Sequence, residues 1–154
     1  MFHFVVRRLR WLARIPGVPH VFDALLLTHT AIFRRPCLAA IEAITESMGQ
    51  LPEVRLCIHR FGGIEFVAAD RELGHIHGNG LLDVHLGREE ATRCVGEGRA
   101  EWHHLFGPSA WVSYWVRSEA DVTGAIALLR AALAIADENA ALQNPMCAAA
   151  RRAG

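Results

Sequence analysis

Three histidines and one aspartate lie close together near the middle of this 154-residue chain, on either side of a Gly-Asn-Gly segment. His75 and His77 precede the segment, and Asp83 and His85 follow it. If both flanks are strands, alternate side chains share a face, because successive side chains of a strand point to opposite sides. A three-residue hairpin loop over residues 78–80 then places His75 opposite Asp83, and all four polar side chains share one face. The other face is apolar and turns toward a core, with Ile76, Leu82, Val84 and Leu86.

This set of residues is compatible with three interpretations. The imidazoles of His75, His77 and His85 could hold Zn²⁺ or Fe²⁺ with a position open for water or substrate, and Asp83 could be a fourth ligand or the partner of a ring N–H. Without a metal, the same histidines could remove a proton from an acidic enol or phenol and return it elsewhere, because histidine titrates near neutral pH. Asp83 would then orient the His75 ring and favour its charged form. The third interpretation is a solvated hairpin that is merely rich in histidine, and spacing alone leaves all three open.

Strands must flank this hairpin to hold it in place. Alternating apolar residues predict strands over residues 54–58 and 64–67, joined by a turn at 61–63, and a fifth strand over 110–116. We expect His59, which follows the first strand, to be solvated. The segment 101–108, rich in histidine and aromatic residues, is predicted to be a loop of the kind that often rims a pocket.

Helices are predicted over residues 20–33, 38–48 and 88–95 and, after a Ser118–Asp121 capping box, over a long apolar stripe that continues to about residue 133. Together the elements predict an α+β fold: a two-layer structure with a mostly antiparallel sheet of about five strands and helices packed on one face. The other face of the sheet would carry the histidines.

The chain is predicted to contain one domain, over residues 20–140. Residues 1–19 form a basic amphipathic segment, whose part from 2 to 15 could lie on an anionic membrane surface or pack on the domain, and residues 141–154 are expected to fray. Sixteen basic residues balance sixteen acidic ones, so net charge gives no reason to expect nucleic acid as a partner. No apolar stretch reaches the roughly 18–20 residues of a membrane span, and arginines interrupt any signal-peptide core. We therefore expect a cytoplasmic protein, peripheral membrane contact being the alternative. The four cysteines form no CxxC pair and are expected to be reduced thiols: Cys37, Cys57, Cys94 and Cys147.

Several motifs from residue 71 onward occur in the same order as in a known family. They are Arg71-Glu72-Leu73-Gly74-His75-Ile76-His77, Val84-His85-Leu86, Gly98, His103-His104-Leu105-Phe106-Gly107, Tyr114 and Arg117. This set resembles the luciferase-domain family, which includes the fungal luciferases and many short bacterial proteins. The resemblance covers about residues 71–136, with a weaker similarity at Trp11-Leu12 and Pro16.

The resemblance implies an oxygen-dependent enzyme. Fungal luciferases oxidise 3-hydroxyhispidin, a hydroxylated pyrone, with O₂ through an endoperoxide that loses CO₂ and emits light, and no metal or organic cofactor is known to be required. This favours histidine acid–base catalysis, with O₂ as co-substrate and a small aromatic molecule as partner. The resemblance carries catalytic roles to His75, His77, His85, His103 and Tyr114, and the hairpin geometry adds Asp83.

Aromatic residues near these positions are candidates for the walls of a substrate pocket. We expect Trp102, His104, Phe106, Trp111 and Trp115 to bind substrate, although a place in the core is the alternative for the tryptophans. The chain departs from the family in three respects: fungal luciferases are longer and have an N-terminal membrane segment, His104 stands where a proline is typical, and Asp83 is outside the family motif. A metal-dependent enzyme and a non-catalytic ligand-binding or membrane-surface module remain the alternatives to the oxygenase.

Overall fold

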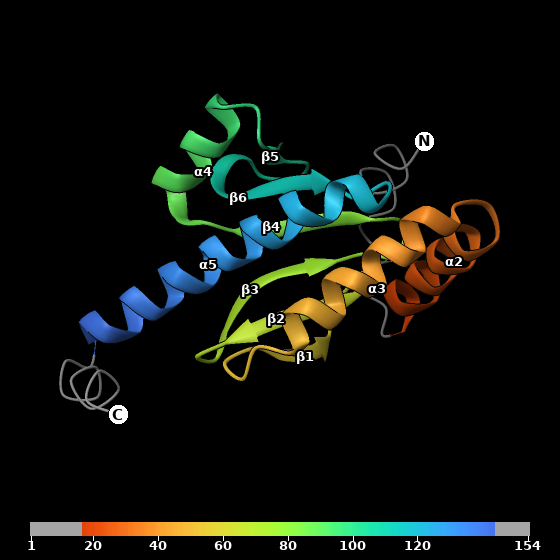
Figure 1. Ribbon diagram of the computed structural model, residues 1–154, viewed down its shortest axis with the longest axis horizontal. Helices are drawn as coiled ribbons and strands as arrows, with labels where there is room; N and C mark the ends of the chain where they lie inside the picture. The colour runs from red at the N-terminus through yellow and green to blue at the C-terminus, as the bar shows by residue number, and fades with distance from the viewer. Residues whose placement is uncertain (1–16, 144–154) are drawn as a thin grey trace.

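A single antiparallel sheet forms one layer of the molecule, and helices form the other (Figure 1). The computed structural model describes residues 17–143, and its strands follow the order β1-β2-β3-β4-β6-β5 across the sheet. The strands are β1 (Arg55–Ile58), β2 (Ile64–Ala68), β3 (Arg71–Ile76), β4 (Leu81–His85), β5 (Glu101–His103) and β6 (Gly107–Trp115). The predicted α+β class is confirmed, with six strands rather than five. The additional strand is β5, in the segment predicted to be a loop, where three residues pair with β6.

The helices are α2 (Val18–Phe33), α3 (Arg35–Gly49), α4 (Gly87–Gly96) and α5 (Val122–Gln143), the last preceded by a short 3₁₀ turn, η2 (Glu119–Asp121). The chain leaves the helical conformation at Arg34 between α2 and α3, and Pro36 stands in the first turn of α3, where its missing N–H needs no partner. The predicted capping box is present before α5, with Ser118 and Asp121 capping each other. Figure 1 shows α3 and α5 side by side across one face of the sheet.

The hydrophobic core lies between the sheet and these two helices. Leu82 and Val84 of β4 and Val112 of β6 are fully buried, and they belong to the same cluster as Ile44 of α3 and Leu129 of α5. Alternate residues of β4 therefore face the core, as the apolar pattern predicts. Asp83 and His85, which alternate with these two residues, face the opposite side of the sheet.

The central hairpin has the predicted register. The backbone of His77 donates to Leu81 O at 2.9 Å, and His75 stands opposite Asp83. Gly80 closes the loop with φ +85°, and a Cβ atom there would lie 2.1 Å from Val116 O. Glycine is required at this position by both its conformation and its surroundings.

A β-bulge in β3 changes which residues share the histidine face. Phe66 of β2 pairs with Gly74, but the next residue, Val67, pairs with Glu72, so Leu73 is the extra residue. Leu73 is buried in the core, and Glu72 consequently lies on the same face as His75, although simple alternation would separate them. The bulge thus adds a carboxylate to the polar face.

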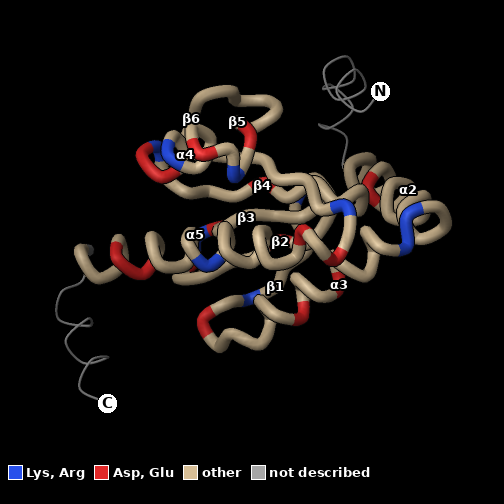
Figure 2. Tube along the Cα trace, turned by 45° about the horizontal axis from the view of Figure 1, so that its top comes forward, with Lys and Arg blue, Asp and Glu red and all other residues tan. Residues whose placement is uncertain are grey.

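Two of the predicted segments lie outside the described residues. These are the basic amphipathic segment over 2–15 and the tail beyond residue 143, whereas α5 includes residues 141–143 that the sequence assigns to the tail. No helix within residues 17–143 has the length and apolar content needed to cross a membrane. Figure 2 shows acidic and basic residues interspersed over the sheet and the helices.

Candidate functional site

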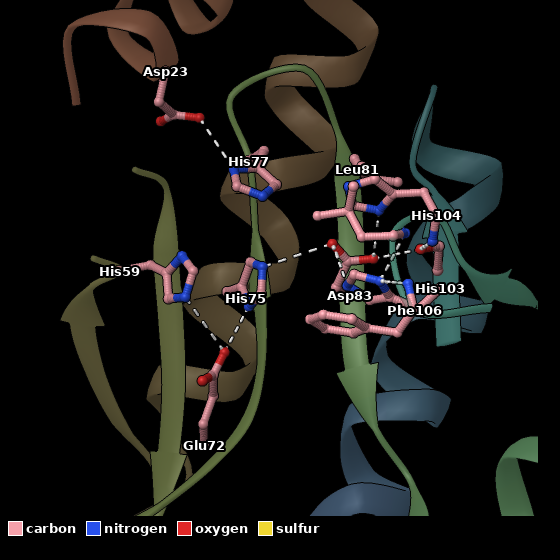
Figure 3. A network of polar contacts seen from close by, with 12 residues as sticks. Asp23, His59, Glu72, His75, His77, Leu81, Asp83, His103, His104 and Phe106 are labelled. Carbon is pink, nitrogen blue, oxygen red and sulfur yellow. Dashed lines mark hydrogen bonds and ion pairs between the residues drawn. The ribbon is translucent and has the colours of Figure 1, made fainter. Parts of the chain in front are cut away.

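Polar side chains from five elements meet on the face of the sheet opposite α3 and α5 (Figure 3). They come from α2, β3, β4, β5 and β6, and from the residues that directly follow β1, β3 and β5. We call them the histidine cluster, which consists of Asp23, His59, Glu72, His75, His77, Asp83, His103, His104 and Ser113. Four of its members were not predicted from the sequence: Asp23, His59, Glu72 and Ser113.

Asp83 is the centre of this cluster and has no exposed surface. Its Oδ1 atom accepts a short hydrogen bond from the Ser113 hydroxyl, and Oδ2 lies 3.6 Å from both His75 Nε2 and His103 Nε2. Burial raises the pKa of Asp83, but contacts with His104, His103 and Ser113 outweigh it and hold the pKa below its usual value. Asp83 is therefore a buried carboxylate ion at neutral pH. Its Oδ2 atom has no hydrogen-bond partner among the described residues.

His75 lies between two carboxylates. Its Nδ1 atom is 2.6 Å from Glu72 Oε1, on one side, and its Nε2 atom faces Asp83 on the other. Burial raises the pKa of Glu72, but the hydrogen bond with His75 and the charges of the nearby histidines lower it further than burial raises it. The Glu72 carboxylate consequently fixes the orientation of the His75 ring, the role that carboxylates commonly play behind functional histidines.

His59 packs directly against this pair. It is 2% exposed, and its ring stacks on that of His75 at 3.8 Å with an angle of 9°. Burial, together with the neighbouring charge of His75, lowers the pKa of His59 to about 4. The prediction of a solvated His59 is therefore wrong, because the β1–β2 turn folds the residue over β3.

His77 connects the hairpin to α2. Its Nδ1 atom lies 3.5 Å from Asp23 Oδ1, which also accepts a 2.9 Å hydrogen bond from the backbone N–H of Gly78. Burial raises the pKa of Asp23, but these partners lower it below its usual value overall. A charged carboxylate on α2 therefore holds both the ring of His77 and the loop of the hairpin.

His103 is in the cluster, but both of its ring nitrogens are engaged. Nδ1 accepts hydrogen bonds from the backbone N–H groups of Leu105 and Phe106, at 3.1 and 3.4 Å, so in the neutral ring Nε2 carries the hydrogen that faces Asp83. Burial lowers its pKa to about 4, although the charge of Asp83 opposes this shift. The ring also stacks on Phe106 at 4.4 Å. This geometry suits a residue that holds the turn after β5, and it leaves no free nitrogen to accept a proton from a substrate.

His85 lies on the same face but apart from the other histidines. Trp111 stands between them, with its ring 5.1 Å from that of His85 and about 6 Å from those of His75 and His103. His85 is half-buried, and burial lowers its pKa, so its imidazole is neutral at pH 7. The three histidines predicted as metal ligands, His75, His77 and His85, are therefore not gathered into one ligand set.

The residues predicted to line a substrate pocket lie on both faces of the sheet. Trp111 and Trp115 of β6 share the face of Ser113, and Phe106 is 62% exposed above His103. Trp102 instead packs against the core, where it pairs with Val112.

Tyr114 also lies on the helix side of the sheet. It belongs to the side chains packed on the core, and its hydroxyl lies against Gly124 of α5, where a Cβ atom would come within 2.5 Å of it. Burial raises the pKa of this hydroxyl. The structure therefore does not bring Tyr114 into the histidine cluster, because residue 114 has the opposite orientation to Ser113 on β6.

Three groups of ligand-type atoms occur in the part of the chain that the structure describes. Each contains two histidines and one carboxylate with ligand atoms within 4.8 Å of one another. The groups are His59, Glu72 and His75; His75, His77 and Asp83; and Asp83, His103 and His104. The cluster can thus transfer protons between imidazoles and carboxylates, and it also contains candidate metal ligands.

The fold and the cluster together define a class of protein: a small α+β domain with helices on one face of an antiparallel sheet and a histidine–carboxylate cluster on the other. Residues 70–132, which run from the residue before β3 into α5, match the family model of the luciferase domain. The match confirms the resemblance found in the sequence and indicates a luciferase-like function, of oxidoreductase type, at the level of the family. The comparisons with curated proteins and with solved structures each found no match.

Proposed function

We propose that the protein is a luciferase-like oxygenase that uses O₂ to oxidise an enolisable or phenolic aromatic substrate similar to 3-hydroxyhispidin. The match to the luciferase domain supports the type of reaction. The single observation that supports the chemistry is a neutral, half-buried imidazole, His85, beside the indole of Trp111 on the face that carries the histidine cluster. A neutral imidazole next to an aromatic surface can take a proton from an aromatic substrate that stacks there.

His85 is the best-placed base among the cluster and its neighbours. His59 and His103 are also neutral at pH 7, but they are 2% and 5% exposed, and the nitrogens of His103 are already engaged. The Nδ1 atom of His75 is bonded to Glu72. Only His85 combines a lowered pKa with partial exposure, so we assign proton removal to it.

The proposed reaction begins with proton transfer from the enol or phenol O–H of the substrate to Nε2 or Nδ1 of His85. The resulting anion is electron-rich, and its carbon forms a bond with O₂ to give a peroxide anion. The protonated His85 then returns the proton to the peroxide oxygen, which closes the balance of charge and protons. N–H donors of the neighbouring histidines stabilise the oxyanions that develop. Written in this form, the reaction needs no cofactor supplied by the protein.

The second candidate function is a metal-dependent form of the same oxidation. The metal would be Zn²⁺ or Fe²⁺, the two ions that the sequence also suggested. The buried Oδ2 atom of Asp83, which faces two histidines without a hydrogen-bond partner among the described residues, specifically favours it. The ligands would include Asp83 in place of His85.

The proposed function is tested by measuring O₂ uptake and light emission with 3-hydroxyhispidin as the probe. The unmodified protein should consume O₂ at millimolar substrate, and His85→Ala should lower kcat by about 10²–10⁴-fold, the usual contribution of a general base. The His29→Ala variant, which changes an exposed histidine of α2, is the matched control and should retain full activity. Absence of turnover by the unmodified protein, or an unchanged rate in His85→Ala, would refute the assignment.

A further inference from the structure

The space between His75, His77 and Asp83 has the features of a metal site. His75 lies on β3 and His77 directly follows that strand, whereas Asp83 lies on the neighbouring strand β4, and their ligand atoms lie within 4.8 Å of one another. Asp83 has no exposed surface, and its Oδ2 atom, which points toward His75 in Figure 3, has no hydrogen-bond partner among the described residues. We propose that His75, His77 and Asp83 bind one divalent first-row transition-metal ion.

Two carboxylates stand behind the two histidines, as expected of metal ligands. Glu72 accepts from Nδ1 of His75 at 2.6 Å, and Asp23 lies 3.5 Å from Nδ1 of His77. Histidines that bind a metal almost always donate their other ring N–H to a carboxylate, carbonyl or water, which fixes the tautomer and makes the ligating nitrogen more basic. Both rings of the proposed site have this arrangement.

The electronic state of His75 also calls for a cation. When Nδ1 donates its hydrogen to Glu72, Nε2 of the neutral ring carries a lone pair. This lone pair faces the Asp83 carboxylate oxygen at 3.6 Å, so two acceptors face each other. A positive charge between them, from a metal ion or a proton, resolves the repulsion, and the nearby second imidazole of His77 favours the metal ion.

The other two groups of ligand-type atoms fit a metal less well. In the group with Glu72, the 2.6 Å separation from His75 is that of a hydrogen bond, whereas two ligands of one ion at about 2.1 Å stand about 3.0–3.4 Å apart. In the group with His103, Nδ1 accepts backbone hydrogen bonds, so the nitrogen that faces Asp83 carries a hydrogen and cannot ligate in the neutral ring. Neither objection applies to the group of His75, His77 and Asp83.

The distances require little movement to close around an ion. The 3.6 Å between His75 Nε2 and Asp83 Oδ2 is near the ligand separation given above, and the largest separation in the group, at most 4.8 Å, needs to shorten by no more than about 1.4–1.8 Å. Two histidines and one carboxylate with open positions are the ligand set of non-haem Fe(II) oxygenases, and a related set holds catalytic zinc. An ion here would stabilise negative charge on a substrate oxygen near Trp111. The inference concerns binding alone and does not depend on the oxidation proposed above.

The experiment uses the full chain without an affinity tag, stripped with a chelator and reloaded with Zn²⁺, or with Fe²⁺ under anaerobic conditions. Mass-spectrometric metal analysis after removal of free ion should give about one equivalent, and loading should raise Tm because the ion binds the folded state. His77→Ala and Asp83→Asn should each reduce affinity at least tenfold, and Glu72→Gln should reduce it about 10–100-fold. His85→Ala, which changes a histidine on the same face outside the ligand set, should bind the ion as the unmodified protein does.

Two results would overturn the inference. One is less than about a tenth of an equivalent after reloading of the folded, unmodified protein, and the other is equal binding by the unmodified protein, His77→Ala and Asp83→Asn. His77 is only partly buried, so its alanine variant keeps the test valid if Asp83→Asn fails to fold. O₂ uptake is measured on the same samples: one bound equivalent without oxidation supports the metal site and refutes the proposed function, whereas oxidation by protein that binds no metal does the reverse.

Discussion

The stability of the protein should fall markedly between pH 7.5 and pH 5, because the fold buries two histidines in the neutral form. The pKa values of His59 and His103 are lowered from 6.5 to about 4 by burial. Between these two values the unfolded chain binds protons that the folded protein does not, so stability is complete above pH 6.5 and is lost as the pH falls toward 4. The nearby carboxylates with lowered pKa values titrate below this range and do not change the sign.

The size of the effect follows from the same two values. At pH 5 a histidine with a pKa of 6.5 in the unfolded chain is almost fully protonated, and one with a pKa of about 4 is almost neutral, which corresponds to about 2 kcal/mol per residue. The two residues together should lower the free energy of unfolding by about 3–4 kcal/mol, a large part of the roughly 5–15 kcal/mol typical of a domain.

Urea denaturation followed by tryptophan fluorescence at pH 5.0, 6.0 and 7.5 measures this change. A chelator is present throughout, because a bound metal ion would add its own pH dependence. The His103→Gln variant removes one of the two groups and should show about half the pH dependence, whatever its absolute stability. The exposed His29→Ala variant should match the unmodified protein. A free energy of unfolding that is equal at pH 5.0 and 7.5 within about 0.5 kcal/mol would refute the burial of neutral histidines.

Three further predictions concern other parts of the structure. Gly80→Ala should destabilise the protein by more than about 2 kcal/mol, because φ is +85° and the new Cβ would lie 2.1 Å from a carbonyl oxygen, whereas Gly96→Ala, with open space at the end of α4, should change the free energy of unfolding by less than about 0.5 kcal/mol. Asp23→Asn should speed hydrogen exchange at the Gly78 amide by about tenfold, because the charged acceptor of that N–H is lost, and unchanged exchange would contradict the link between α2 and the hairpin. Cys94 should react slowly with a thiol reagent at pH 8 in the folded protein, because burial raises its pKa to about 11, and labelling as fast as that of a free thiol would contradict this.

The central hairpin could be predicted in detail because its signals are local. A Gly-Asn-Gly segment between two alternating runs defines the loop, and the loop length determines that His75 stands opposite Asp83. Alternation then places Leu82 and Val84 in the core, as the structure has them. These residues are close in sequence, so no knowledge of the remaining fold was needed.

The sequence did not predict Glu72 as a member of the histidine cluster, because the alternation of side chains along a strand is interrupted at a β-bulge. The extra residue Leu73 returns Glu72 to the histidine face, and a bulge depends on the pairing with β2 rather than on the sequence of β3 alone. The short strand β5 was missed for a similar reason, since three residues carry too little periodicity to distinguish a strand from a loop.

The remaining members of the histidine cluster depend on contacts between distant segments. Asp23 is 55 positions from Gly78, whose N–H it accepts, and His59 reaches His75 only because the β1–β2 hairpin pairs with β3 in the sheet. Tyr114 shows the converse case: alternation along the strand places it on the face of Val112 and away from Ser113, and only the resemblance assigned it to the site. For the orientation of that residue, the strand pattern was the better guide.

Alternate side chains of β4 face the core and the histidine cluster, and this limits where the chain can change in length. Leu82 and Val84 face the core while Asp83 and His85 face the histidine cluster, so insertion or deletion of one residue within β4 would exchange the two sets. A carboxylate ion would then enter the apolar core against α3 and α5, and the histidine cluster would lose its central residue in the same event. Changes of length are therefore tolerable in the surface loops between the elements and not in this strand, where folding and chemistry depend on the same register.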